Sequence, residues 1–230
     1  MYFRTDGIIG RMGLLGYTPR PQTKMRPSAQ PPIQAHGHLG QPARPTNSYD
    51  KCWDPQRRAI EAAFLQALGS VNHAAQLLGT AYGRPNTMTQ RTRDLLIRHF
   101  HTTDRDEVLR VFRNLFRISQ AFQKGLSFEC EIDCGSRVRC GYAFATQWFG
   151  GFGRIHICFD NRPGFCSFAN LTAQQQAAAI IHEAAHRHVG ISDKAYVWER
   201  KPPNSRDYTK LTPNQAIDNA DSYAWFSVES

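Results

Sequence analysis

The segment HEAAH at residues 182–186 contains two histidines four positions apart, with a glutamate directly after the first. On a helix, side chains at this spacing project from one face, so His182 and His186 can bind one tetrahedral metal ion. Glu183 can then accept a proton from water at that metal. The alternative is an exposed helix with solvated polar side chains. The apolar AAAII run directly before His182 instead favours a buried helix and a metal-dependent hydrolytic site.

A catalytic zinc ion needs a third protein ligand and an open position for water. His188 is excluded, because two helical residues rotate it by about 200° from His186. Two acidic residues follow the expected helix end at Gly190. Asp193 can return to the histidines through a short turn, and Glu199 is a more distant candidate. From the residues alone, both Asp193 and Glu199 remain candidates for the third ligand.

The elements that must position these residues are mainly helical. Apolar residues recur at helical spacing in segments that start at capping residues and stop at glycines. We expect helices over about 54–79, 89–100, 104–124, 172–190 and 212–226. Between residues 127 and 160, short segments rich in β-branched and aromatic residues predict a small, mainly antiparallel sheet. Helices before and after a small sheet indicate the α+β class.

The first 50 residues differ in composition from the rest of the chain. They hold 7 of the 13 prolines and 6 of the 17 glycines, without sustained periodicity. We therefore expect residues 1–50 to be a flexible leader or propeptide, and residues 51–230 to form one catalytic domain.

The net charge of +9 and the hydropathy pattern restrict the partners. A basic charge alone produces non-specific attraction, and no nucleic-acid-binding motif accompanies it, so we expect no nucleic-acid partner. No apolar run approaches the roughly 20 residues of a membrane-spanning helix. The alternative to an enzyme is a basic protein- or nucleic-acid-binding module whose motif is inactive or holds a structural metal.

The chain has six cysteines, and none of them forms a C-x-x-C pair. This spacing favours disulfides over a structural zinc site, and hence an oxidising destination. The N-terminus shows no continuous apolar signal sequence with a small-residue cleavage site. We therefore expect a protein that is secreted, or delivered into a target cell as an effector or toxin. In a reducing cytosol the cysteines would instead be buried thiols.

The segment HEAAHRHVGISDKAY resembles the aspzincin metallopeptidases, the family of deuterolysin and peptidyl-Lys metalloendopeptidase. In that family H-E-x-x-H is followed by G-T-x-D-x-x-Y-G, and Asp193 and Tyr196 keep the D-x-x-Y spacing. NADSY at 219–223 is similar to the family's last helix, and FECEIDC and RIHIC are similar to its cysteine-bearing sheet. Isoleucine and serine at 191–192 replace G-T, and Val197 replaces the last glycine. The likeness covers about residues 50–226.

This resemblance implies a zincin-like fold and a zinc endopeptidase with one Zn²⁺ per chain. By the likeness, His182, His186 and Asp193 hold zinc, and Glu183 is the general base and acid. Tyr196 donates a hydrogen bond to the developing oxyanion. These roles agree with the chemistry of the side chains. We expect protein or peptide substrates and a monomer.

The resemblance also suggests a substrate preference. In the Lys-specific members, the aspartate of the last-helix motif lies in the pocket for the residue after the scissile bond. Asp221 is therefore a candidate substrate-binding residue. Those members have a glutamate three residues later, where this chain has Ala224, so we expect only a partial preference for Lys or Arg. The alternative for Asp221 is a carboxylate that orients a metal-bound histidine.

The family pattern further implies the pairing of the cysteines. It joins Cys52 to Cys130 and Cys134 to Cys158, and it leaves Cys140 to pair with Cys166.

Overall fold

The computed structural model describes residues 45–83, 87–132, 134, 143–145, 153–160, 167–197 and 207–230, all within the unit Pro42–Ser230. Residues 1–44, which make up most of the expected leader, lie outside the described residues. The strand β1 (Ser48–Asp50) belongs to a sheet. The folded part therefore includes three residues that the sequence assigned to the leader.

The helices lie close to the expected segments. They are α1 (Asp54–Gly83), α2 (Gln90–Phe100), α3 (Arg105–Lys124), α4 (Ala173–Val189), α5 (Pro213–Ile217) and α6 (Ala220–Glu229), with 3₁₀ turns η2 (Phe168–Asn170) and η3 (Tyr208–Lys210). Side-chain caps begin several of them, because Thr89 and Asp104 accept hydrogen bonds from the first-turn N–H groups of α2 and α3. Within the described segments, no helix combines the length and apolar character needed to cross a membrane.

The first helix is longer than predicted, because α1 continues through Gly79 to Gly83. A glycine inside a helix costs about 1 kcal/mol relative to alanine, so its position favoured a helix end. Here the missing side chain allows close packing between α1 and α3. A Cβ atom at Gly79 would lie only 3.1 Å from Cε2 of Phe112. Gly79 therefore allows a close contact between two helices and does not end α1.

The sheet has the strand order β1-β2-β4-β3, with β2 (Ser127–Glu131), β3 (Ala143–Ala145) and β4 (Ile155–Cys158). The prediction of a mainly antiparallel sheet is wrong, because β2 pairs parallel with both β1 and β4, and among the described strands only β3 and β4 are antiparallel. Three helices separate β1 from β2, and such a long connection allows strands to run in the same direction. Residue composition indicated strands but not their direction.

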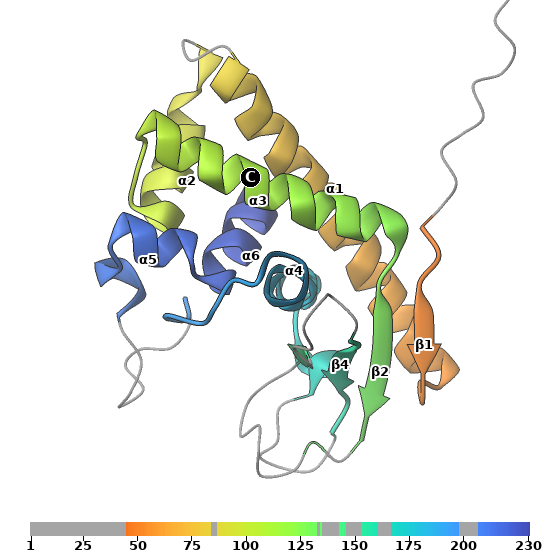
Figure 1. Cartoon of the computed structure of the whole chain (residues 1–230). Coiled ribbons are helices and arrows are strands. Elements are labelled where there is room, and N and C mark those ends of the chain that lie inside the picture. The colour runs from red at the N-terminus through yellow and green to blue at the C-terminus, as the bar shows by residue number, and fades with distance from the viewer. Residues whose placement is uncertain are drawn as a thin grey trace, which may run out of the picture. The chain divides into compact units, whose positions relative to one another are not determined.

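The helix α4 lies between β4 and the helices α3 and α6 (Figure 1). It contacts α1, α3 and α6 as well as β3 and β4. Six of its small and β-branched residues are almost fully buried, namely Ala177, Ala178, Ile180, Ile181, Ala184 and Ala185. Because alanine lets neighbouring backbones approach closely, the apolar run before the histidines forms the centre of the core. The histidine segment is thereby held in a rigid position.

The last predicted helix is divided in two, because α5 ends at Ile217 and α6 begins at Ala220. At the corner between them, Asn219 forms a parallel β-bridge with Ser192. The backbone N–H of Ala220 donates to the Ser192 carbonyl over 3.0 Å. This long-range pairing replaces helical hydrogen bonds at the corner, and helical periodicity could not show it.

Two disulfides have the pairing that the family resemblance implied. Cys52–Cys130 joins the start of α1 to β2 across 78 residues, and Cys134–Cys158 ties the segment after β2 to β4. Closing a loop of that length stabilises the fold by about 4 kcal/mol in the chain-entropy account. Cys140 and Cys166 lie outside the described residues.

Candidate metal centre

The helix α4 presents His182 and His186 on one face, as their spacing predicts. Their Nε2 atoms lie 2.9 Å apart, and both rings are buried. The helix begins with the predicted capping box, in which Thr172 and Gln175 exchange hydrogen bonds. His188 lies outside the histidine cluster, as expected from helix geometry.

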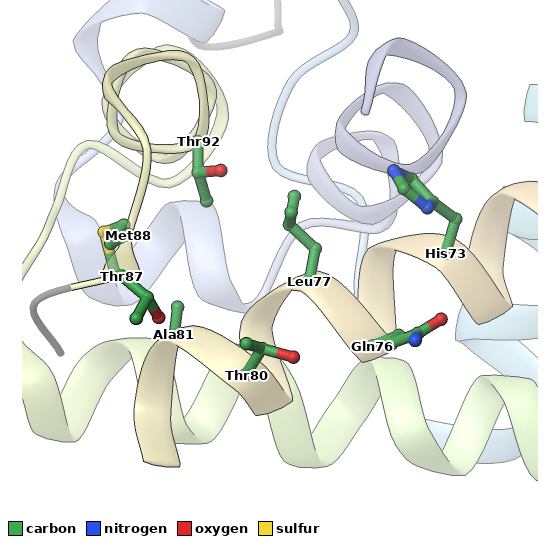
Figure 2. Close-up of a pocket in the computed structure, with 8 residues that line it drawn as sticks. All are labelled: His73, Gln76, Leu77, Thr80, Ala81, Thr87, Met88 and Thr92. Carbon is green, nitrogen blue, oxygen red and sulfur yellow. The ribbon is translucent and has the colours of Figure 1, made fainter. Parts of the chain in front are cut away.

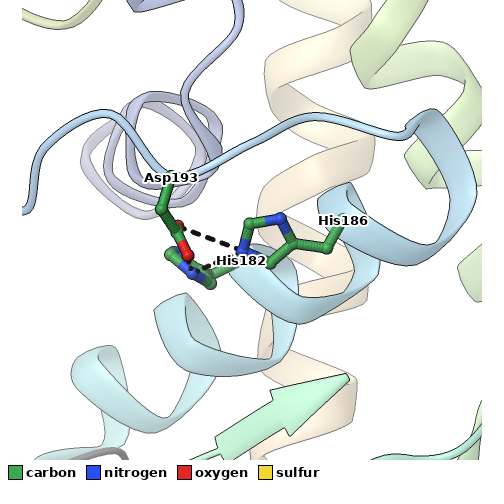
Figure 3. A group of neighbouring side chains, drawn as sticks. All are labelled: His182, His186 and Asp193. Atoms are coloured by element: carbon green, nitrogen blue, oxygen red, sulfur yellow. Dashed lines mark hydrogen bonds and ion pairs between the residues drawn. The ribbon is translucent and has the colours of Figure 1, made fainter. Parts of the chain in front are cut away.

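A tight turn after α4 brings the third group to the histidines. Gly190 adopts a left-handed conformation with φ 76° and ψ 27°, which a glycine accommodates without strain. The chain then reverses, and Oδ1 of Asp193 lies 3.1 Å from Nε2 of both His182 and His186. Figure 3 shows the carboxylate pointing toward both rings from the loop above the helix. The competing candidate Glu199 lies outside the described residues.

The outer nitrogens of both rings have hydrogen-bond partners. Nδ1 of His182 lies 2.8 Å from Oδ1 of Asp221, and Nδ1 of His186 lies 2.5 Å from the carbonyl oxygen of Ile191. A carbonyl or carboxylate oxygen can only accept, so each Nδ1 carries the proton. In the neutral rings, each Nε2 then presents its lone pair to the centre of the cluster, which is the form that binds a metal.

This arrangement fits a small cation. When both rings are neutral, two lone pairs and a carboxylate oxygen face one another at 2.9–3.1 Å, and positive charge between them, from protons or from a metal ion, relieves the repulsion. Zinc–ligand bonds of about 2.0–2.1 Å in a tetrahedron place the ligand atoms about 3.3 Å apart, close to these separations. The nitrogen and oxygen donors are also those that zinc prefers.

The same electrostatics act on the protonation of the cluster. Burial alone would lower the pKa of His182 and of His186. The Asp193 carboxylate outweighs burial and raises the pKa of both histidines, and at His182 the Asp221 carboxylate adds to this effect. Burial would raise the pKa of Asp193, whereas its hydrogen bonds with the histidines hold that pKa far below its usual range. Protons and a metal ion therefore compete for the same positions, and metal binding releases protons.

The two residues expected to act on substrate lie beside this cluster. Glu183 follows the first histidine on α4 and is 6% exposed. The Tyr196 ring stacks on the His182 ring with centroids 5.6 Å apart and planes at 17°. Burial, reinforced by the negative charge of Asp193, raises the pKa of the Tyr196 hydroxyl above its usual range. The phenol is therefore protonated at neutral pH and able to donate a hydrogen bond.

Asp221, the candidate substrate-binding residue, is buried beside the histidine cluster. Its side chain is only 1% exposed, and its two oxygens accept from Nδ1 of His182 and from the backbone N–H of Val197 over 2.8 Å each. Both oxygens of the carboxylate therefore have a partner within the protein. The placement corresponds to the alternative for Asp221, a carboxylate that orients a metal-binding histidine.

Asn219 is a site residue that sequence reasoning did not single out. It stands first in the NADSY segment, and its amide contacts the backbone of the loop that carries Asp193. The available signal was an asparagine at the break of a predicted helix, since asparagine commonly hydrogen-bonds to nearby backbone.

A second group of possible ligands lies on β2 and β4, comprising Glu129, Glu131 and His156. Glu129 forms ion pairs with Lys51 and Arg154, and Nδ1 of His156 lies 2.7 Å from Glu131. Because these side chains already balance the carboxylate charge, this group has little need of a metal ion.

A cavity of about 390 Å³ lies between α1 and the start of α2 (Figure 2). Its lining is mostly uncharged, with Leu77, Met88 and threonines alongside His73. None of the lining residues belongs to the metal cluster, so this cavity is separate from the candidate centre.

Two histidines of one helix and an aspartate of the following turn converge in a mainly helical α+β domain. This arrangement is a metallopeptidase-type centre. The chain belongs to the aspzincin family, since the family model described as lysine-specific metallo-endopeptidase matches residues 86–228. The protein is therefore a zinc-dependent endopeptidase, as the motif resemblance implied.

A solved structure supports the fold assignment. The zinc peptidase from Grifola frondosa matches 77% of this chain and 97% of its own chain, with a TM-score of 0.53 and 20% sequence identity. This likeness shows a shared fold. No curated protein matches the chain.

Proposed function

We propose that this protein cleaves peptide bonds at the cluster formed by His182, His186 and Asp193, which would hold the zinc ion. The observation that carries the proposal is the convergence of three ligand atoms within 3.1 Å, with the outer nitrogen of each histidine already hydrogen-bonded. Such preorganisation is typical of zinc sites in which neighbouring groups orient the ligands.

The residues around the cluster have distinct roles in this proposal. Zinc, when bound, polarises the scissile carbonyl and makes water more acidic. Glu183 accepts a proton from the attacking water as the new C–O bond forms. It then passes that proton to the leaving nitrogen as the C–N bond breaks. Tyr196 donates a hydrogen bond to the oxygen on which negative charge develops, and its raised pKa keeps the donor proton in place.

The openness of the site favours catalysis over a purely structural metal. The side chain of Asp193 is 41% exposed, so one side of the cluster is accessible to solvent and to substrate. Structural zinc sites are closed by four protein ligands, whereas catalytic sites keep an open position. This accessibility argues against the binding-module alternative.

We further propose a partial preference for Lys or Arg after the scissile bond. The description of the family model as lysine-specific supports it. A direct contact between Asp221 and a basic substrate side chain is not part of the proposal, because His182 and the backbone N–H of Val197 already contact this carboxylate. The two disulfides support the proposal that the protein acts in an oxidising compartment, either as a secreted enzyme or as a delivered effector.

Digestion of casein tests the activity and the preference together. We expect cleavage by the purified protein, loss of cleavage with a zinc chelator, and recovery when zinc is added back. Mass mapping of the products should show Lys or Arg after the cut more often than their abundance in casein predicts. Cleavage that persists in the chelator would contradict the proposed centre, and a map without basic enrichment would remove only the preference.

Substitution of Tyr196 tests the oxyanion role. We expect Tyr196→Phe to lower kcat by about 10²-fold or more, the cost of one oxyanion donor elsewhere. KM should change much less, because the ring and its stacking on His182 are kept. Steady-state kinetics on a fluorogenic peptide measures both constants. Tyr82→Phe, on α1, is a matched control that should leave both unchanged, and an unaltered kcat in Tyr196→Phe would rule the donor role out.

A further inference from the structure

The third ligand of the proposed centre lies on a segment with little secondary structure of its own. Asp193 follows the end of α4, and its side chain is the most exposed of the three in the cluster. A flexible loop would lose conformational entropy each time this carboxylate met the histidines. The affinity of the centre for a metal ion therefore depends on what holds the loop in place.

The corner between α5 and α6 holds the loop on both sides of Asp193. Before it, the carbonyl of Ser192 accepts from the backbone N–H of Ala220 over 3.0 Å. After it, Oδ1 of Asn219 accepts from the backbone N–H groups of Lys194 and Ala195, over 2.8 and 3.1 Å. The side chain of Asn219 thus replaces the hydrogen-bond partners that a helix or strand would supply to these two residues.

The orientation of the Asn219 amide is determined by its other end. Nδ2 donates to the hydroxyl oxygen of Ser222 over 3.1 Å. Backbone N–H groups can only be met by the carbonyl end of the amide, so both contacts require the same orientation. The residue is completely buried, which removes competing water from these hydrogen bonds.

Other contacts to the loop are weaker candidates for this role. The carboxylate of Asp218 pairs with Lys194 and with the hydroxyl of Ser192, each over 3.0 Å. The side chains of Asp218 and Lys194 are 46% and 31% exposed, and exposed ion pairs contribute little to stability. The buried Asp221 carboxylate contacts the loop further on, at the backbone N–H of Val197. Asn219 therefore supplies the buried side-chain contacts to the two residues that directly follow Asp193.

We propose that Asn219 is a positioning residue for the metal centre, which acts by fixing the loop that presents Asp193 to His182 and His186. This inference rests on the proposed role of Asp193 as a ligand. It assigns no contact between Asn219 and the metal or the substrate.

The test compares zinc affinity, measured by competition with a chromogenic chelator, in folded variants of the full chain. We expect Asn219→Ala to weaken zinc binding by about 10- to 100-fold, the usual effect of removing a group that orients a ligand. Asn219→Asp keeps oxygen acceptors for both N–H groups and should recover most of the affinity. If Asn219→Ala does not fold, Asn219→Ser takes its place, because its shorter side chain cannot reach both amides.

A matched control separates positioning from general stability. Asn114→Ala removes a hydrogen bond of 2.8 Å to the hydroxyl of Tyr223 on α6, away from the Asp193 loop. It should lower the melting temperature of the metal-free protein but change zinc affinity by less than about twofold. Equal losses of zinc affinity in Asn114→Ala and Asn219→Ala would overturn the inference.

A double variant shows whether Asn219 acts through Asp193. If it does, Asn219→Ala combined with Asp193→Ala should bind zinc no more weakly than Asp193→Ala alone. A further loss in the double variant, or wild-type affinity in Asn219→Ala, would overturn the inference. Wild-type affinity in the single variant Asp193→Ala would instead refute the proposed ligand, an outcome that involves no change at Asn219.

Discussion

We expect Glu183→Gln to lose proteolysis almost completely while it keeps its fold and its zinc. The amide preserves the shape of the side chain on α4 but cannot accept the proton of the attacking water. General acid–base groups contribute about 10²- to 10⁴-fold to rate, so kcat should fall within or beyond that range. The measurement combines peptide kinetics with elemental analysis of the same samples.

A second glutamine variant shows that the loss is specific to the site. Glu61→Gln changes a partly buried glutamate of α1 that accepts hydrogen bonds from Asn47 and Tyr49 near the sheet. It should keep normal kcat even if its stability falls. Wild-type activity in Glu183→Gln would disprove the assignment of the general base, and loss of zinc in that variant would mean that the glutamate supports the metal centre instead.

The largest effect on metal content is expected from Asp193→Ala. This change removes one of three ligand atoms and leaves two histidines whose Nε2 atoms are 2.9 Å apart. Groups that only orient ligands are commonly worth 10- to 100-fold in affinity, so a direct ligand should cost more than about 100-fold. Elemental analysis of the dialysed protein should show close to one zinc per chain in the wild type and little in the variant.

The competing candidate provides the control for this experiment. Glu199→Ala should keep the zinc content and activity of the wild type, because the observed cluster is already complete with Asp193. If Glu199→Ala lost its zinc and Asp193→Ala retained it, the third ligand would be Glu199. The carboxylate facing both histidines would then have a purely electrostatic role.

The sequence by itself was sufficient for the features that depend on local geometry. The positions of His182, Glu183 and His186 on one helix follow from a four-residue spacing, since helical side chains repeat about every 3.6 residues. The capping box at Thr172 and the left-handed Gly190 were also predictable, because caps involve only neighbouring residues. The motif resemblance correctly identified the family and the two described disulfides.

Features that depend on distant partners were decided only by the tertiary structure. Strand direction follows from the path of the helices between β1 and β2, so a composition rich in β-branched residues could not exclude parallel pairing. The continuation of α1 through Gly79 depends on the ring of Phe112, which lies on another helix. Packing between elements outweighed the local preference in both cases.

The metal centre shows the same division. The spacing of the histidines is local, and the Ile191 carbonyl that contacts Nδ1 of His186 is only five residues away. The group that orients His182 and the groups that hold the loop of Asp193, however, come from residues 24 to 39 positions away. Asp221 contacts His182, and Asn219 contacts the loop backbone, only because α6 packs along α4. A hydrogen bond forms when two groups meet within about 3 Å in the right orientation. That condition is set by the path of the whole chain, and no pattern within a single segment contains it.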